Sequence, residues 1–155
     1  MNNEMNDFSI PGVSDVFGLI PSPFNYVAPK KVPQSSMSPT IVEYKSNNTL
    51  YYLLGGAGGS HIITSILQSL WNVLDREMTG PQALVEPRFH DQLVPDVIQF
   101  EYAYDNATTE FMGQRGHNLT WSSRSSEVQS LRRLPGGVFE AAAEPSLADA
   151  AGCVT

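Results

Sequence analysis

Residues 50–76 read LYYLLGGAGGSHIITSILQSLWNVLDR and change character twice within a few positions. The apolar run over residues 50–54 is typical of a strand that is buried on both faces. After a glycine-rich turn, apolar residues return at helical spacing and predict a helix over residues 60–76, with Ser60 as its N-cap. The apolar positions of this helix are Ile63, Ile66, Leu67, Leu70, Trp71 and Leu74. The stretch therefore predicts a strand, a glycine turn and a helix in direct succession.

The glycine-rich turn, residues 55–60, is the part of this stretch that is best suited to chemistry. Glycine tolerates positive φ and lets the backbone approach a ligand closely. The turn leads into a helix N-terminus, where free N–H groups and the helix dipole favour negative charge. This suits an oxyanion hole, in which backbone donors meet the charge that develops on a carbonyl oxygen. Two alternatives stay open. One is a phosphate site, disfavoured because no Lys-Ser/Thr pair follows, and the other is a tight turn that binds nothing.

The rest of the chain predicts an α+β fold with mainly antiparallel strands and helices stacked on the sheet. Residues 40–44 and 50–54 flank a short polar turn and predict a hairpin. Two further helices are predicted, a short one that begins at residues 79–81 and ends at 85, and one over residues 106–115 that Gly116 ends. The remaining strands are predicted at residues 97–102, 118–122, 128–134 and 138–142, with a hairpin turn at Pro135-Gly136-Gly137.

Both ends of the chain differ from this regular pattern. Residues 8–39 hold six of the eleven prolines together with many apolar residues. They predict an ordered, extended loop that packs against the core. From Glu144 onward the chain is rich in alanine and small residues, which predicts a frayed tail. We therefore predict one domain over residues 1–145 and a flexible tail over residues 146–155.

Composition excludes several classes of protein and site. The net charge is −7 and basic residues form no stripe, which argues against nucleic-acid binding. The single cysteine permits no internal disulfide, and the three histidines are too far apart in sequence for a metal site. We expect no metal and no cofactor. No apolar run is long enough to span a bilayer, and the polar residues 1–7 carry no targeting signal.

Three sequons for N-glycosylation begin at Asn47, Asn106 and Asn118, each beside residues typical of turns. Together they favour a protein of the secretory pathway. Chance occurrence in a chain rich in Asn, Ser and Thr is the alternative, and the two interpretations carry about equal weight.

Two polar pairs are candidate binding residues. Glu4 and Asp7 lie three positions apart and could together hold an ammonium group, although acidic pairs are more often solvated surface. Ser35 and Ser36 offer adjacent hydroxyl and N–H donors to a carboxylate, although most Ser-Ser pairs in loops bind nothing. Residues 88–91, Arg-Phe-His-Asp, are interpreted as a packing and salt-bridge motif.

Four segments in this order resemble the γ-glutamyltransferases, which are also called γ-glutamyltranspeptidases or glutathione hydrolases. They are NEMNDFS at 3–9, PQSSMSPTI at 33–41, GGAGGS at 55–60 and EPRFHDQL at 86–93. The resemblance covers nearly the whole chain, to about residue 145. It implies an N-terminal nucleophile hydrolase, a four-layer αββα sandwich that is incomplete in this chain.

The resemblance also implies roles for individual residues. Glu4 and Asp7 would bind the α-amino group of a γ-glutamyl substrate, and Ser35 and Ser36 would bind its α-carboxylate. Gly58 and Gly59 would donate the oxyanion hole. The family's nucleophile is an N-terminal threonine that self-cleavage of a precursor exposes, and its own amine can act as base. Asn6 replaces a usual aspartate of the motif, while Asp7 is kept.

No residue of this sequence matches that nucleophile, because the chain begins after the family's threonine strand. We therefore expect the C-terminal portion of the small subunit of an enzyme that cleaves glutathione and passes the γ-glutamyl group to water or to amino-acid or peptide acceptors. The expected partners are glutathione, other γ-glutamyl compounds and the large-subunit segment of the same precursor. Membrane attachment is expected only through an N-terminal anchor absent from the chain. A non-catalytic paralogue fragment that binds γ-glutamyl compounds or a partner chain is the alternative.

Overall fold

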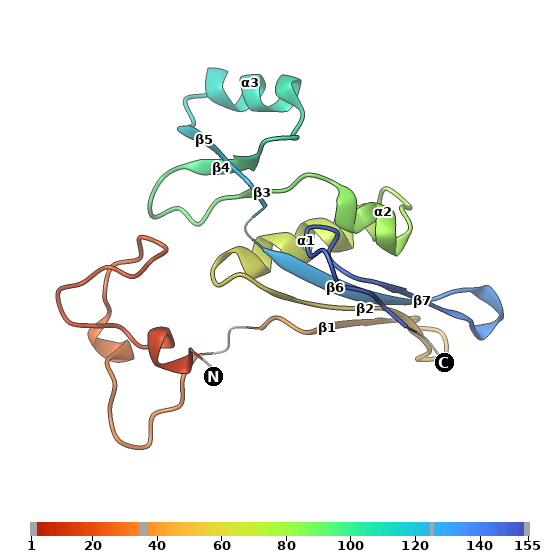
Figure 1. Cartoon of the computed structure of the whole chain (residues 1–155), viewed down its shortest axis with the longest axis horizontal. Coiled ribbons are helices and arrows are strands. Elements are labelled where there is room, and N and C mark those ends of the chain that lie inside the picture. The colour runs from red at the N-terminus through yellow and green to blue at the C-terminus, as the bar shows by residue number, and fades with distance from the viewer. Residues whose placement is uncertain (1–2, 35–36, 125, 154–155) are drawn as a thin grey trace.

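The chain folds around an antiparallel sheet with the strand order β1-β2-β6-β7 (Figure 1). The computed structural model describes residues 3–34, 37–124 and 126–153. The four strands are β1 (Thr40–Glu43), β2 (Leu50–Ala57), β6 (Glu127–Arg133) and β7 (Phe139–Ala142). Two helices, α1 (His61–Leu74) and α2 (Gly80–Val85), pack on one face of this sheet. These elements confirm the predicted hairpin, the predicted strand–turn–helix unit and the hairpin turn at Pro135–Gly137 between β6 and β7.

Strand β2 continues three residues beyond its predicted end. Gly55, Gly56 and Ala57 pair with β6, so the first half of the glycine run belongs to the sheet and not to the turn. A Cβ atom on Gly56 would lie 2.7 Å from the backbone oxygen of Glu127, closer than real Cβ contacts come. Glycine is therefore needed here for close approach of two strands, which local sequence cannot reveal.

The core lies between the inner face of the sheet and the two helices. The sheet contributes Tyr52, Leu54, Val128 and Ala142, and the helices contribute Ile62, Ile66, Val73, Ala83 and Leu84. Helix α2 begins with a capping box, in which Thr79 and Gln82 satisfy each other's backbone N–H groups. Ser60 stands at the N-cap of α1 as predicted, but its side chain makes no capping hydrogen bond because its backbone is already helical.

The outer face of the sheet carries a row of apolar residues that the described part of the chain leaves open. The register aligns Ile41, Leu53, Leu131 and Ala141 across all four strands. Ile41 is 62% exposed and Leu53 is 39% exposed. The prediction that residues 50–54 are buried on both faces is therefore wrong for this chain, since only the face toward α1 is covered.

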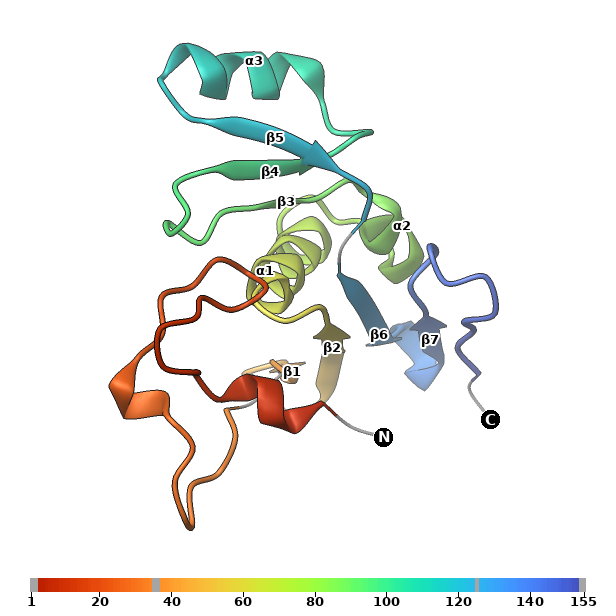
Figure 2. The same ribbon diagram turned by 60° about the vertical axis from the view of Figure 1, so that its left-hand side comes forward.

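A second, smaller sheet has the order β3-β4-β5 and lies beyond α1 (Figure 2). It consists of β3 (Phe89–His90), β4 (Ile98–Glu101) and β5 (Leu119–Ser122). Helix α3 (Asn106–Gln114) connects β4 to β5, and the two strands run parallel. A parallel pair needs such a crossover connection. The other strand pairs of the described residues are antiparallel, as predicted.

The N-terminal loop, residues 8–34, is ordered by turns and hydrogen bonds more than by burial. It follows the short helix η1 (Glu4–Asp7) and contains the single turn η2 (Pro23–Asn25). Phe8 is buried, but Val16 is 88% exposed and Phe24 is 92% exposed. Figure 1 shows the loop projecting away from the sheet. The prediction that its apolar residues pack against the core is therefore wrong for most of them.

A buried network of ion pairs connects the two sheets to the C-terminal segment. Glu144 accepts hydrogen bonds from Arg88 at 2.9 Å and from Arg124 at 2.7 Å, and Arg124 also pairs with Glu101 at 3.0 Å. The Glu144 side chain is fully buried, so the prediction of a tail that frays from Glu144 is wrong at this residue. The interpretation of residues 88–91 as a salt-bridge motif is confirmed at Arg88.

Candidate functional site

Gly58 and Gly59 form the turn between β2 and α1, with φ values of 131° and 61°. Their carbonyl oxygens accept hydrogen bonds from the N–H groups of His61 and Ile62, each at 3.2 Å. Within residues 3–34, 37–124 and 126–153, nothing accepts from the N–H of Gly58 or Gly59. The turn thus holds two adjacent backbone donors in a fixed orientation next to a helix N-terminus. Such a pair is suited to an anionic oxygen.

Phe17 of the N-terminal loop closes over this turn. A Cβ atom on Gly59 would lie 2.0 Å from Cζ of Phe17, so no side chain fits at this position. A Cβ atom on Gly55, by contrast, would have no neighbour within 4 Å. Sequence analysis did not single out Phe17, because nothing local distinguishes it from Phe24, which is exposed.

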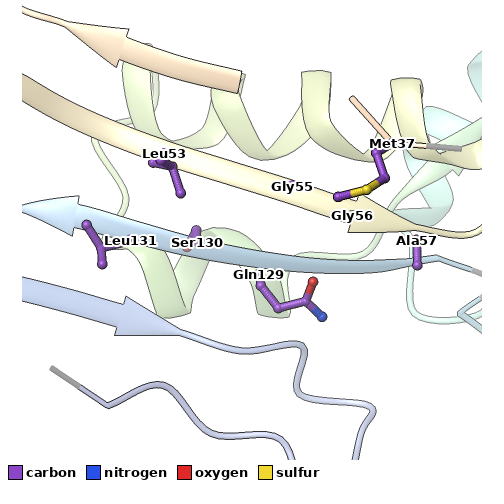
Figure 3. Close-up of a pocket in the computed structure, with 8 residues that line it drawn as sticks. All are labelled: Met37, Leu53, Gly55, Gly56, Ala57, Gln129, Ser130 and Leu131. Carbon is purple, nitrogen blue, oxygen red and sulfur yellow. The ribbon is translucent and has the colours of Figure 1, made fainter. Parts of the chain in front are cut away.

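A pocket of about 540 Å³ lies on the outer face of the sheet, along the end of β2 that leads into the glycine turn. Met37, Gly55, Gly56 and Ala57 line it together with residues 129–131 of β6 (Figure 3). The volume lies within the range of small-molecule sites. Met37 directly follows the two predicted serines in the sequence. Ser35 and Ser36 themselves lie outside the described residues.

Glu4 and Asp7 lie on the same short helix, η1, with Glu4 exposed and Asp7 half-buried. The backbone of η1 is tied to η2, because the Asn25 amide donates to the carbonyl oxygen of Asp7 at 2.8 Å. The structure thus brings the two predicted carboxylates together on one turn. The contact between the N-terminal loop and the glycine turn, however, comes from Phe17.

The described residues contain no cluster of three or more His, Cys, Asp or Glu side chains that could hold a metal ion. None of the described helices is both long and apolar enough to cross a membrane.

The gamma-glutamyltranspeptidase family profile matches residues 1–154. A glutathione hydrolase proenzyme of Arthroderma benhamiae is 52% identical over 154 residues, which cover 99% of this chain and 26% of that protein. A crystal structure of an acivicin-inhibited gamma-glutamyltranspeptidase superposes with a TM-score of 0.85 and 37% identity. It covers 94% of this chain and 79% of that one. The N-terminal nucleophile hydrolase fold expected from sequence is confirmed by this match.

The chain spans about a quarter of the length of the Arthroderma benhamiae proenzyme. The chain covers a larger share of a shorter relative. Scoloptoxin SSD20 of Scolopendra dehaani is 32% identical, and the match covers 91% of this chain and 72% of that protein.

Proposed function

Because the chain belongs to the gamma-glutamyltranspeptidase family, we propose that it supplies the oxyanion-stabilising and substrate-binding part of a glutathione hydrolase. The complete enzyme cleaves the γ-glutamyl amide bond of glutathione and transfers the acyl group to water or to an amino-acid or peptide acceptor. The observation that carries the proposal is the pair of N–H donors on Gly58 and Gly59, from which no described residue accepts.

The geometry suggests how this part acts. Attack on the γ-carbonyl carbon places negative charge on the carbonyl oxygen, and the N–H groups of Gly58 and Gly59 stabilise that charge. Their carbonyl groups are tied to the first turn of α1, so the donors need little reorganisation during the reaction. The nucleophile comes from the rest of the enzyme, as the family's N-terminal threonine does.

Four side chains hold the substrate in this proposal. Glu4 and Asp7 bind the α-amino group, because two carboxylates on one short helix can accept several hydrogen bonds from an ammonium. Ser35 and Ser36 bind the α-carboxylate, and Met37 beside them lines the pocket at the end of β2. The substrate then lies between the N-terminal loop and the sheet, with its γ-carbonyl at the glycine turn.

Activity is tested with the chain alone and in a complete enzyme. Residues 1–155 are purified alone, and they also replace the corresponding segment of the Arthroderma benhamiae proenzyme. We expect the chimera to release p-nitroaniline from γ-glutamyl-p-nitroanilide and the isolated chain to match the blank, because only the chimera contains a nucleophile. Turnover by the isolated chain, or an inactive but correctly processed chimera, would contradict the proposal.

We propose that the remaining segment of the precursor, the large subunit included, covers the exposed apolar surfaces of this chain. One surface is the outer row of the sheet. The other is the outer side of α1, where Ile63, Leu67, Trp71 and Leu74 are between 47% and 68% exposed. Surfaces of this kind mark contacts with other protein. Their spacing places the α1 residues on one helical stripe.

We expect the isolated chain to self-associate through these surfaces, and Leu67→Glu to reduce that association by placing a charge in the stripe. Light scattering coupled to size-exclusion chromatography measures the mass of the particle. Ala103→Glu adds the same charge at an exposed position outside the stripe and serves as the matched control. A monomeric wild-type chain would argue against uncovered association surfaces.

A second candidate function is binding without catalysis. The match to Scoloptoxin SSD20, a relative most of whose length this chain covers, supports a short family member that acts by itself. Calorimetry with glutamate tests this candidate on the isolated chain. Binding without turnover favours it, whereas no binding by a folded isolated chain leaves only the role within the complete enzyme.

We propose that the protein passes through the secretory pathway and carries glycans at Asn47 and Asn106. Asn47 is exposed at the tip of the β1–β2 hairpin, and its Oδ1 atom accepts from the N–H and hydroxyl of Thr49 at 3.1 and 2.8 Å. Its Nδ2 atom, which would carry the glycan, donates to no described residue. Asn118 differs, because its Nδ2 already donates to the carbonyl oxygen of Asp96 at 3.1 Å.

We expect two glycans per chain when the protein is expressed behind a leader peptide in a eukaryotic secretory host. Intact mass before and after peptide-N-glycosidase treatment counts them. Asn47→Gln and Asn106→Gln should each remove one glycan, and Asn118→Gln should remove none. An unmodified wild-type chain, or a glycan on Asn118, would show that the hydrogen bond of the asparagine amide does not decide the sites.

A further inference from the structure

Two histidines from different elements stack beside the glycine turn. His61 is the first residue of α1, His90 lies in β3, and their ring centroids are 4.0 Å apart. His90 is buried and His61 is half-buried. They border a small cavity of about 10 Å³, which is lined mostly by polar side chains.

Hydrogen bonds indicate which ring nitrogens carry protons. Gln92 donates its amide to the carbonyl oxygen of Phe17 at 2.7 Å, so its Oε1 faces Nε2 of His90 at 2.9 Å. His90 Nε2 is therefore the donor. His61 Nε2 lies 2.8 Å from Oε1 of Gln99, which is an acceptor, and donates to it. The Nδ1 atom of His61 has no partner among the described residues.

The Thr64 hydroxyl lies between the two histidines. It is 2.9 Å from Nδ1 of His90 and 3.1 Å from the carbonyl oxygen of His61. When His90 is neutral, the hydroxyl can donate to Nδ1. When His90 is protonated, Nδ1 becomes a donor and the hydroxyl must donate to His61 instead. Protonation of His90 therefore reverses a hydrogen bond in the first turn of α1.

The same residues form a closed set of contacts around the glycine turn. The N–H of His61 donates to Gly58, and the ring of His61 packs edge-on against Phe17 with centroids 6.2 Å apart. Phe17 lies over Gly59, and its carbonyl oxygen accepts from Gln92, which also contacts His90. Gly58, Gly59 and the N-terminal loop are thus held to β3 through the two imidazoles.

We propose that His61, stacked on His90, is a positioning residue for the oxyanion hole, and that it fixes the N–H groups of Gly58 and Gly59 while His90 is neutral. The inference rests on the proposed function of the glycine turn. A charge on His90 would reverse its hydrogen bond with Thr64 and turn the Thr64 hydroxyl to the carbonyl oxygen of His61. This change lies in the first turn of α1, to which the glycine carbonyls are bonded.

Charged groups that face the pair come from every neighbouring segment. Asp91 follows His90, Arg88 and Glu101 lie across the cavity, and Asp15 caps the Phe17 turn. Glu101 is held by Arg124 and Arg88 by Glu144, so neither is free to neutralise a histidine. Burial lowers the pKa of His90 below its usual value of 6.5, and the charge of His61 lowers it further, against the hydrogen bond to Gln92. His90 is therefore neutral at neutral pH and becomes charged in acid.

The kinetic test uses the complete chimeric enzyme. We expect His61→Gln, which keeps a donor for Gln99 but removes the ring, to lower kcat about 10- to 100-fold with KM changed less than about 2-fold. Rates are normalised to active sites by titration with a covalent inhibitor, so that loss of folded protein does not count. His61→Phe keeps the packed ring and should recover part of kcat. His117→Gln changes an exposed histidine and serves as the control.

The pH profile separates positioning from packing. In the wild type, kcat should fall in acid as His90 becomes charged. In His61→Gln this acid limb should move, because His90 then titrates without a charged neighbour. An unchanged acid limb, or an unchanged kcat in His61→Gln, would overturn the inference.

A second measurement does not depend on catalysis. Glycine amides labelled with ¹⁵N in the chimera should show resonances of Gly58 and Gly59 that shift with the titration of His90, and the shift should be lost in His61→Gln. If the wild-type chimera proves inactive, the proposed function fails and this measurement still decides the coupling. Glycine resonances that stay fixed while His90 titrates would refute it.

Discussion

Gly59→Ala should lower kcat of the complete chimeric enzyme about 10²- to 10³-fold, the loss typical of removing an oxyanion-hole donor. The φ of Gly59 is 61°, which is unfavourable for alanine, and the added Cβ would lie 2.0 Å from the Phe17 ring. Either the ring or the peptide must move, and both displace the N–H that faces the substrate oxygen. Initial rates with γ-glutamyl-p-nitroanilide measure the loss.

Gly116→Ala is the matched control for this variant. Gly116 also has a positive φ, 88°, but it lies just after α3, and its Cβ would meet open space. We expect it to change kcat less than about 3-fold, well below the loss at an oxyanion donor. Similar losses in both variants would show that alanine at positive φ, and not a displaced donor, causes the loss.

The double variant Gly59→Ala/Phe17→Ala separates the two causes of the loss. Removing the ring relieves the clash but leaves alanine at positive φ, a conformation that costs roughly 1 kcal/mol or more outside glycine. We therefore expect kcat to recover only in part. Full recovery of kcat would mean that the clash with the Phe17 ring alone causes the loss. No recovery would mean that the positive φ of the alanine alone causes it.

Glu144→Gln should destabilise the chain by about 3–5 kcal/mol, because it leaves a buried arginine without its counter-charge. Arg88 is 3% exposed and Glu144 is fully buried. Glutamine keeps the volume of the side chain, so the expected loss is electrostatic. Urea unfolding at one fixed protein concentration measures it, since the stability of an associating chain depends on concentration.

Glu86→Gln removes one partner of the exposed pair with Arg76, at the same 2.9 Å separation. We expect a loss below about 1 kcal/mol, because water screens the exposed charges. If Glu144→Gln and Glu86→Gln lower the free energy of unfolding equally, burial does not set the strength of these ion pairs. The two pairs share a separation, but Glu86 is partly exposed with one arginine partner, whereas Glu144 is buried with two.

The contribution of Glu144 to folding stability depends on pH in a definite direction. Burial raises the pKa of this carboxyl, but the hydrogen bonds and charges of Arg124 and Arg88 outweigh burial and hold it below the usual 4.5. A folded-state pKa below the unfolded value means stability that is present above about pH 4.5 and lost as the pH falls through the folded value. The wild type should lose this stability in acid, and Glu144→Gln should not show that loss.

Local patterns predict most elements because each element depends on a short stretch of adjacent residues. Helix α1 follows from apolar residues at helical spacing, and α3 follows from a polar start and a stop at Gly116, where φ is 88°. The glycine turn is recognisable as a candidate site for the same reason, since its backbone properties depend on a few adjacent residues. The motifs that resemble gamma-glutamyltranspeptidases are likewise contiguous, and they identify the family.

What the sequence by itself determined, then, is the order of elements, the family and the glycine turn as a candidate oxyanion site. The tertiary structure alone decided that Phe17 seals Gly59, that His61 stacks on His90, and that Glu144 is buried between two arginines. Each of these contacts joins residues at least 20 positions apart, where no periodicity or turn rule reaches. Such pairs form only after the sheet and helices pack, because packing brings the side chains together and removes the water that would otherwise solvate them.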